Sequence, residues 1–174
     1  MAARRPVEQF EFRPPTTTAV LERMRGLSEA RDGWMNLLPG VPEEEVEPPS
    51  RNIFSSLFGT AQPPVSMCTW IPPGGARGAS GGRGRDEGET IGILHPRGRR
   101  AAAQLADLGV AVPVGWRVSQ DHSRRGLIAH PLSGAPLDDQ LEWMLRAGAA
   151  LAVVPLSGAW QAQVFLPRTA PRLS

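Results

Sequence analysis

The sequence predicts an α+β protein whose residues 89–168 form a ferredoxin-like domain. Two observations lead to this fold class. Strand-like and helix-like patterns alternate after residue 89, and this region contains an internal repeat. ILHP at 93–96 matches IAHP at 128–131, and VPVGWRV at 112–118 matches VPLSGAWQAQV at 154–164. A duplicated β-α-β unit predicts a four-stranded antiparallel sheet with two helices on one face.

Each element of the predicted domain has its own sequence signal. The strands alternate apolar and polar residues, whereas the helices repeat apolar residues every three or four positions. Gly109 is placed to end the first helix. Pro136, Asp138 and Asp139 suit the first turn of the second helix, where proline is tolerated and negative charge is favoured. The expected elements are, in order, strand 90–96, helix 97–109, strands 112–120 and 126–131, helix 136–151 and strand 159–167.

The N-terminal part is predicted to pack on this domain. Residues 1–17 suggest a polar tail, and Val20, Met24 and Leu27 fall on one face of a helix expected at about 18–31. Alternation over 65–71 predicts an extra strand. The apolar residues of 53–58 are expected to dock on the main domain, with contact to a partner as the alternative. The alternative architecture is an α/β sandwich with 65–71 as a fifth, edge strand.

Two further segments have loop-like composition. An acidic run from Glu43 to Glu47 is bracketed by prolines, which disfavour regular structure. Residues 74–88 are rich in glycine and arginine and predict a flexible linker or loop. Residues 18–73, which contain the helix, the acidic loop and the extra strand, are expected to pack on the main domain. Residues 169–174 are expected to be a C-terminal tail.

Composition limits the class of protein. All 19 basic residues are arginine, and the abundance of alanine, glycine and proline indicates high-GC, bacterial coding. The net charge of +2 is too small to indicate a polyanion partner, although residues 76–135 hold nine arginines against five acidic residues. One cysteine, Cys68, excludes an intrachain disulfide and favours the cytoplasm. No apolar run approaches 18 residues, so no membrane span is expected.

The stretch SQDHSRRGLIAHP, residues 119–131, contains the most reactive side chains. Asp121, His122 and Ser123 are adjacent and fall between two predicted strands, so a hairpin turn is expected and not a catalytic triad. A weak ligand or hydrolytic site on Asp121 and the three histidines, His95, His122 and His130, stays open. Metal-ligand spacing and nucleotide-binding motifs are missing, so no metal and no cofactor are predicted.

Arginine and tryptophan supply the candidate contact residues. Arg97, Arg99 and Arg100 precede a helix, whose N-terminus favours anions. Trp143 falls off the main apolar face of its helix and is expected to be an exposed anchor for a partner. Three further arginines join the candidates for contacting a partner or an anion, namely Arg117, Arg124 and Arg125.

These observations favour a non-catalytic interaction or regulatory module that binds a protein partner or a second copy of itself. Two alternatives stay open. The first is nucleic-acid or polyanion binding through the arginines, and the second is a small-ligand or hydrolytic site on the histidines. A fold does not specify a function, so the sites decide between them.

Overall fold

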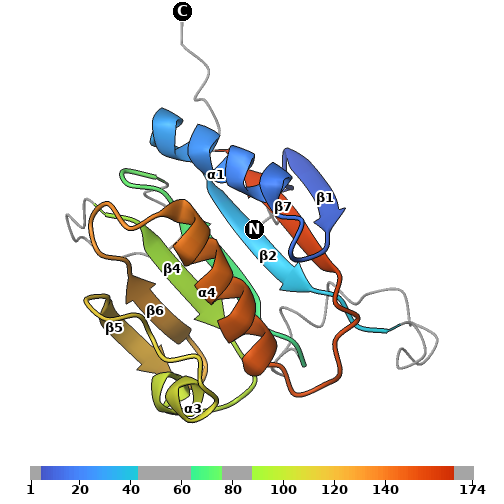
Figure 1. The fold of residues 1–174 in the computed structure, drawn as a ribbon, viewed down its shortest axis with the longest axis vertical. Helices are drawn as coiled ribbons and strands as arrows, with labels where there is room; N and C mark the ends of the chain where they lie inside the picture. Colours follow the sequence, from blue (N-terminus) through green and yellow to red (C-terminus); the bar gives the residue numbers. More distant parts are fainter. Residues whose placement is uncertain (1–4, 43–63, 76–87, 167–174) are drawn as a thin grey trace, which may run out of the picture.

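A computed structural model describes residues 5–42, 64–75 and 88–166, which form one seven-stranded antiparallel sheet with three helices (Figure 1). The strand order is β1-β7-β2-β3-β4-β6-β5. In chain order the elements are β1 (Glu8–Phe12), α1 (Thr18–Ala30), β2 (Trp34–Pro39), β3 (Met67–Ile71), β4 (Thr90–Leu94), α3 (Ala101–Asp107), β5 (Arg117–His122), β6 (Gly126–His130), α4 (Leu137–Ala150) and β7 (Trp160–Phe165).

The predicted ferredoxin-like fold is wrong. β7 does not lie beside β4, because β2 and β3 occupy the sheet between them. The alternative sandwich is also wrong about 65–71, since β3 is the central strand of the seven and not an edge strand. Residues 8–12, expected in a tail, pair with β7 along five residues. Strands from both ends of the chain therefore share one sheet with the predicted repeat.

The local elements are closer to expectation. The helix expected at about 18–31 spans Thr18–Ala30, and the strand expected at 65–71 spans Met67–Ile71. The hairpin predicted around residue 123 is present, because β5 and β6 pair antiparallel across the turn. The expectations for 43–47, 53–58, most of 74–88 and the C-terminal tail lie outside the described residues.

The core lies between the sheet and the two longer helices. α1 and α4 cover the same face in Figure 1, while α3 is placed at the edge formed by β5 and β6. Alternate residues of the central strands point to this face, where the register aligns Met35 with Trp70 and Cys68 with Ile93. Burying such side chains removes apolar surface from water at roughly 25 cal/mol per Å². This burial is the main stabilising term of the fold.

Polar contacts fix the helices on the sheet. The indole nitrogen of Trp70 donates to Gln140 Oε1 at 2.9 Å, and Gln140 Nε2 donates to the Ala135 carbonyl at 3.0 Å. Both partners are buried, so breaking the pair would leave an unsatisfied polar group in the core. Arg23 of α1 forms a two-pronged bond with Glu8 of β1 at 2.6 and 2.8 Å, and this bond lowers the pKa of Glu8.

The second face of the sheet is not covered by any helix among the described residues. Trp34 and Phe165, from paired strands, stack on this face with ring centroids 4.9 Å apart. Thr69 donates a hydrogen bond to Asn36 across the β2–β3 pair at 2.9 Å. Side chains of this face therefore satisfy one another across neighbouring strands.

Two glycines provide a test of how closely α4 approaches the sheet. A methyl group on Gly148 of α4 would lie 2.8 Å from Cys68 Sγ and 3.0 Å from Trp160 Cη2, whereas one on Gly26 of α1 would meet nothing within 4 Å. We expect Gly148→Ala to lower the free energy of unfolding by about 1–3 kcal/mol through overpacking. Gly26→Ala should raise it by about 0.5–1 kcal/mol through helix propensity.

Urea unfolding followed by tryptophan fluorescence measures both changes. The two variants add the same methyl group to a helical glycine, so each is the control for the other. A Gly148→Ala variant as stable as the wild type would contradict the close packing of α4.

Candidate functional site

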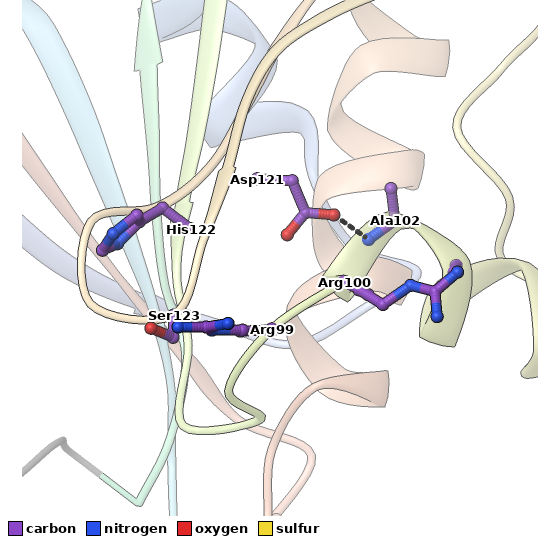
Figure 2. Close-up of a pocket in the computed structure, with 7 residues that line it drawn as sticks. Arg99, Arg100, Ala102, Asp121, His122 and Ser123 are labelled. Carbon is purple, nitrogen blue, oxygen red and sulfur yellow. Dashed lines mark hydrogen bonds between the residues drawn. The ribbon is translucent and has the colours of Figure 1, made fainter.

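A pocket of about 430 Å³ lies between the start of α3 and the β5–β6 hairpin (Figure 2). Residues of the loop before α3 and of its first turn form one wall, and the end of β5 with its turn forms the other. The lining residues are Arg99, Arg100, Ala102, Ala103, Asp121, His122 and Ser123. The structure therefore brings together five polar residues from two regions that are about 20 positions apart in the sequence.

Asp121 connects the two walls of this pocket. Its carboxylate accepts hydrogen bonds from the backbone N–H groups of Ala101 and Ala102 at 2.9 and 3.0 Å. Figure 2 shows the bond to Ala102. The first N–H groups of a helix have no partner within the helix and are stabilised by a side-chain acceptor. For α3 this acceptor comes from β5 and not from the residue before the helix. These N–H groups are already bonded, so the expected anion site at the start of this helix does not have them available.

His122 stabilises the tip of the hairpin. Its Nδ1 accepts from the backbone N–H groups of Arg124 and Arg125 at 3.1 and 3.2 Å. Gly126 closes the turn with a φ of +79°, and its Cα faces the Ile93 carbonyl so closely that no Cβ fits. Asp121 and His122 thus bind different backbone groups, Asp121 at the start of α3 and His122 at the hairpin tip.

Four exposed arginines belong to the two segments that form the pocket, and we refer to them as the arginine cluster. Arg99 and Arg100 line the pocket, whereas Arg124 and Arg125 follow the lining residue Ser123 in the hairpin turn. Among the described residues, none of the four makes an ion pair. Other arginines differ in this respect, since Arg25 lies 3.7 Å from Asp138 and Arg146 lies 3.7 Å from Glu142. The cluster therefore concentrates positive charge that described carboxylates do not neutralise directly.

Two predicted contact arginines lie elsewhere. Arg97 donates from Nη2 to the Ala152 carbonyl at 3.0 Å and to the Ala150 carbonyl at 3.5 Å, so it holds the loop before α3 against the end of α4. Arg117 begins β5, at the opposite end of this strand from the hairpin tip. A six-residue strand is about 20 Å long, so Arg117 is separated from the cluster.

The structure does not bring His95 and His130 together. β4 and β6 pair antiparallel, so equivalent ends of these two strands lie at opposite ends of the sheet. His95 continues the core face that carries Ile93, whereas His130 lies on the second face with Ile128. His95 and His130 therefore do not converge on one site.

His130 lies instead in a row of hydroxyl groups on the second face. Its Nε2 is 2.8 Å from Ser119 Oγ, and its Nδ1 is 3.4 Å from Thr90 Oγ1. Ser119 falls at an irregularity in the β5–β6 register, between Val118 and Gln120. Sequence reasoning missed both hydroxyl residues, because only the strand pairing and the bulge place them beside the ring.

Burial determines the environment of Trp143 and of Cys68. Trp143 is 6% exposed, packs edge-on against Trp116 and donates to the Ala111 carbonyl at 3.1 Å, so the expected surface anchor is wrong. Burial raises the pKa of the Cys68 thiol to about 12, which makes it unreactive near neutral pH. No three His, Cys, Asp or Glu side chains in the described ranges gather closely enough to hold a metal ion.

The contact between Asp121 and α3 can be tested by substitution. We expect Asp121→Ala to lower the free energy of unfolding by about 1–2 kcal/mol, because two N–H groups lose their acceptor. Asp121→Asn should lose about half as much, since an amide oxygen keeps one bond. Asp107→Ala is the matched control, because it removes an exposed carboxylate from α3 without a cap.

Urea unfolding monitored by tryptophan fluorescence gives these differences. Equal losses for Asp121→Ala and Asp107→Ala would show that net charge, and not the cap, sets the stability of this region.

Comparison with known proteins gives no relative from which a role for this site could be inferred. No protein-family model matches the chain, and neither curated proteins nor solved structures give a match.

Proposed function

We propose that this chain is a non-catalytic interaction module that binds an acidic segment of a protein partner through the arginine cluster. The observation that carries the proposal is the absence of described ion pairs at Arg99, Arg100, Arg124 and Arg125, beside a pocket of about 430 Å³. Guanidinium groups bind carboxylates in a two-pronged geometry, so exposed and unpaired arginines are suited to acidic side chains.

The framework of the site supports binding more than catalysis. Asp121 and His122 hold the two walls of the pocket through backbone N–H groups, so both side chains already serve as hydrogen-bond acceptors for the main chain. A nucleophile needs a base within hydrogen-bond reach, and the base needs a third group to orient it. Asp121 instead fixes the start of α3, directly after Arg99 and Arg100, and His122 binds the backbone of Arg124 and Arg125.

A protein partner is favoured over nucleic acid. Non-specific nucleic-acid binding depends on many phosphate contacts and on exposed aromatic rings for unpaired bases. The cluster has four arginines, no described aromatic ring other than that of His122 lines the pocket, and Trp116 and Trp143 pack against each other. A short acidic segment matches the size of this surface better than a nucleic-acid backbone.

The proposed setting is the cytoplasm of a bacterium. It is supported by the single, buried cysteine and by the composition, in which every basic residue is arginine. Within the described ranges the longest helix, α4, has 14 residues, and no helix has the length and apolar character needed to cross a bilayer. The partner is proposed to be a different protein or a second copy of this chain.

Paired substitutions test the arginine cluster directly. A fluorescently labelled peptide of eight glutamates is titrated with the wild type, with Arg99→Ala/Arg124→Ala and with Arg25→Ala/Arg146→Ala. Both double variants remove two positive charges, but Arg25 and Arg146 already have carboxylate partners. We expect about a tenfold weaker affinity for the cluster variant, equivalent to about 1.4 kcal/mol, and little change for the control.

Two outcomes of this titration would overturn the proposal. Equal weakening in both double variants would mean that only net charge matters. A labelled single-stranded oligonucleotide that binds more tightly than the peptide, and depends on Arg99 and Arg124, would favour nucleic acid. Peptide binding should also weaken between low and moderate salt, since exposed charges are screened.

A further inference from the structure

His95 is a fully buried histidine without hydrogen-bond partners. It follows β4 directly and continues the core face of that strand, with a side chain that is 0% exposed. Neither ring nitrogen has a hydrogen-bond partner, and the same holds for the buried hydroxyl of Ser66. The pairing of Met67 with Leu94 places Ser66 opposite His95 on the next step of the ladder.

Such a position tolerates the neutral ring much better than the charged one. Burying a neutral polar group without a partner is unfavourable, and burying a charge without a partner is considerably more so. Burial accordingly lowers the pKa of His95, while the negative charge of Asp121 partly opposes this effect.

The charges around His95 are few. Asp121 on β5 is the described charge that acts on the ring, and Ser66 before β3 is neutral. On the loop that follows, the Arg97 guanidinium is directed to carbonyls at the end of α4. The buried residues that α3 and the end of α4 contribute are apolar, namely Ala101, Leu105, Ala147, Leu151 and Ala152.

His95 is also the first anchor of the loop that carries half of the arginine cluster. After it, the side-chain amide of Gln104 donates to the carbonyls of Arg97 and Arg99 at 3.0 and 2.9 Å. The loop then enters α3, whose first N–H groups are held by Asp121. The position of Arg99 and Arg100 therefore depends on a short segment that begins in the core.

We propose that His95 is a pH-sensitive anchor, and that its protonation releases loop 96–100 and moves Arg99 and Arg100 away from Arg124 and Arg125. The last step rests on the proposed function, since it makes binding of the acidic partner depend on pH. The unfolded histidine binds its proton near pH 6.5, and the folded one only at lower pH. The anchored state is therefore fully favoured above 6.5 and is progressively lost as the pH falls below it.

Nuclear magnetic resonance of the full chain tests the anchor without any ligand. The His95 ring and the backbone amides of Ala101 and Ala102 are followed from pH 8 to pH 5. We expect these amides to shift with the same midpoint as the His95 ring, below 6.5. His95→Gln and His95→Leu should lose this shared transition, although both retain Asp121.

His130→Gln is the matched control, because His130 lies on the opposite face of the sheet and at the other end of the paired strands. It should leave the transition of Ala101 and Ala102 unchanged. Amides that do not follow the ring, or that keep the transition in both His95 variants, would overturn the anchor. If His95→Leu does not fold, the anchor is still tested by two results: the midpoints of the His95 ring and of the two amides in the wild type, and the behaviour of the amides in His95→Gln.

A second measurement separates the anchor from the proposed function. The probe is a labelled peptide of sulfotyrosines, whose sulfate charges stay constant over this pH range. Uptake of one proton limits the loss of affinity to about tenfold per pH unit. We expect wild-type affinity to fall more steeply between pH 7.5 and pH 5.5 than His95→Gln affinity. His122, which lines the pocket and binds the hairpin tip, is present in both proteins, so the difference between them isolates His95.

The outcomes of the two measurements are distinguishable. A peptide that binds independently of Arg99 and Arg124 contradicts the proposed function. In that case the titration of the Ala101 and Ala102 amides still tests whether His95 anchors the loop. A peptide that depends on these arginines but binds equally at both pH values supports the proposed function and overturns the pH dependence of binding.

Discussion

The packing of α4 on the central strands determines where most other parts of the molecule lie. Gly148 allows the helix to approach Cys68 and Trp160 closely, and Gln140 holds its first half to Trp70 of β3. The end of the same helix presents the carbonyls that bind Arg97. One helix therefore links the apolar core to the loop that forms one wall of the pocket. A shift of α4 would change both the packing and the placement of the arginine cluster.

The two faces of the sheet follow from this arrangement. The face under α1 and α4 collects the large apolar side chains, because alternate residues of each strand point toward the helices. The second face carries polar pairs such as Thr69 with Asn36, and the stacked rings of Trp34 and Phe165. Among the described residues, these side chains contact one another across neighbouring strands. The candidate site lies at neither face but at the edge, where the sheet ends with β5.

The sequence allowed local structure to be predicted better than strand order. The helix with Val20, Met24 and Leu27 has a clear period, and the hairpin turn has strong local signals. β7 carries the expected alternation, but nothing in its residues indicates that β2 and β3 separate it from β4. Pairing between strands distant in sequence is decided by the summed packing of the core, which a repeat of short motifs does not encode.

Errors about the site have the same origin. The repeat gave His95 and His130 equivalent positions, but antiparallel pairing sends equivalent ends of neighbouring strands in opposite directions. Trp143 was misjudged because Trp116, distant from it in sequence, covers a helix face that periodicity assigns to solvent. The placement of Arg99 and Arg100 beside the hairpin depends on the bonds of Asp121 to α3, which also join residues distant in sequence.

The arginine cluster is held in place by main-chain bonds and not by ion pairs. Asp121 uses its carboxylate on two N–H groups of α3, and His122 uses its Nδ1 on two N–H groups of the hairpin tip. Gln104 holds the loop between them through carbonyl groups. Because the framework is fixed in this way, the guanidinium groups need no internal carboxylate to hold their position. The proposed acidic partner would then meet arginines that have no described ion pair to break, which lowers the cost of forming new ones.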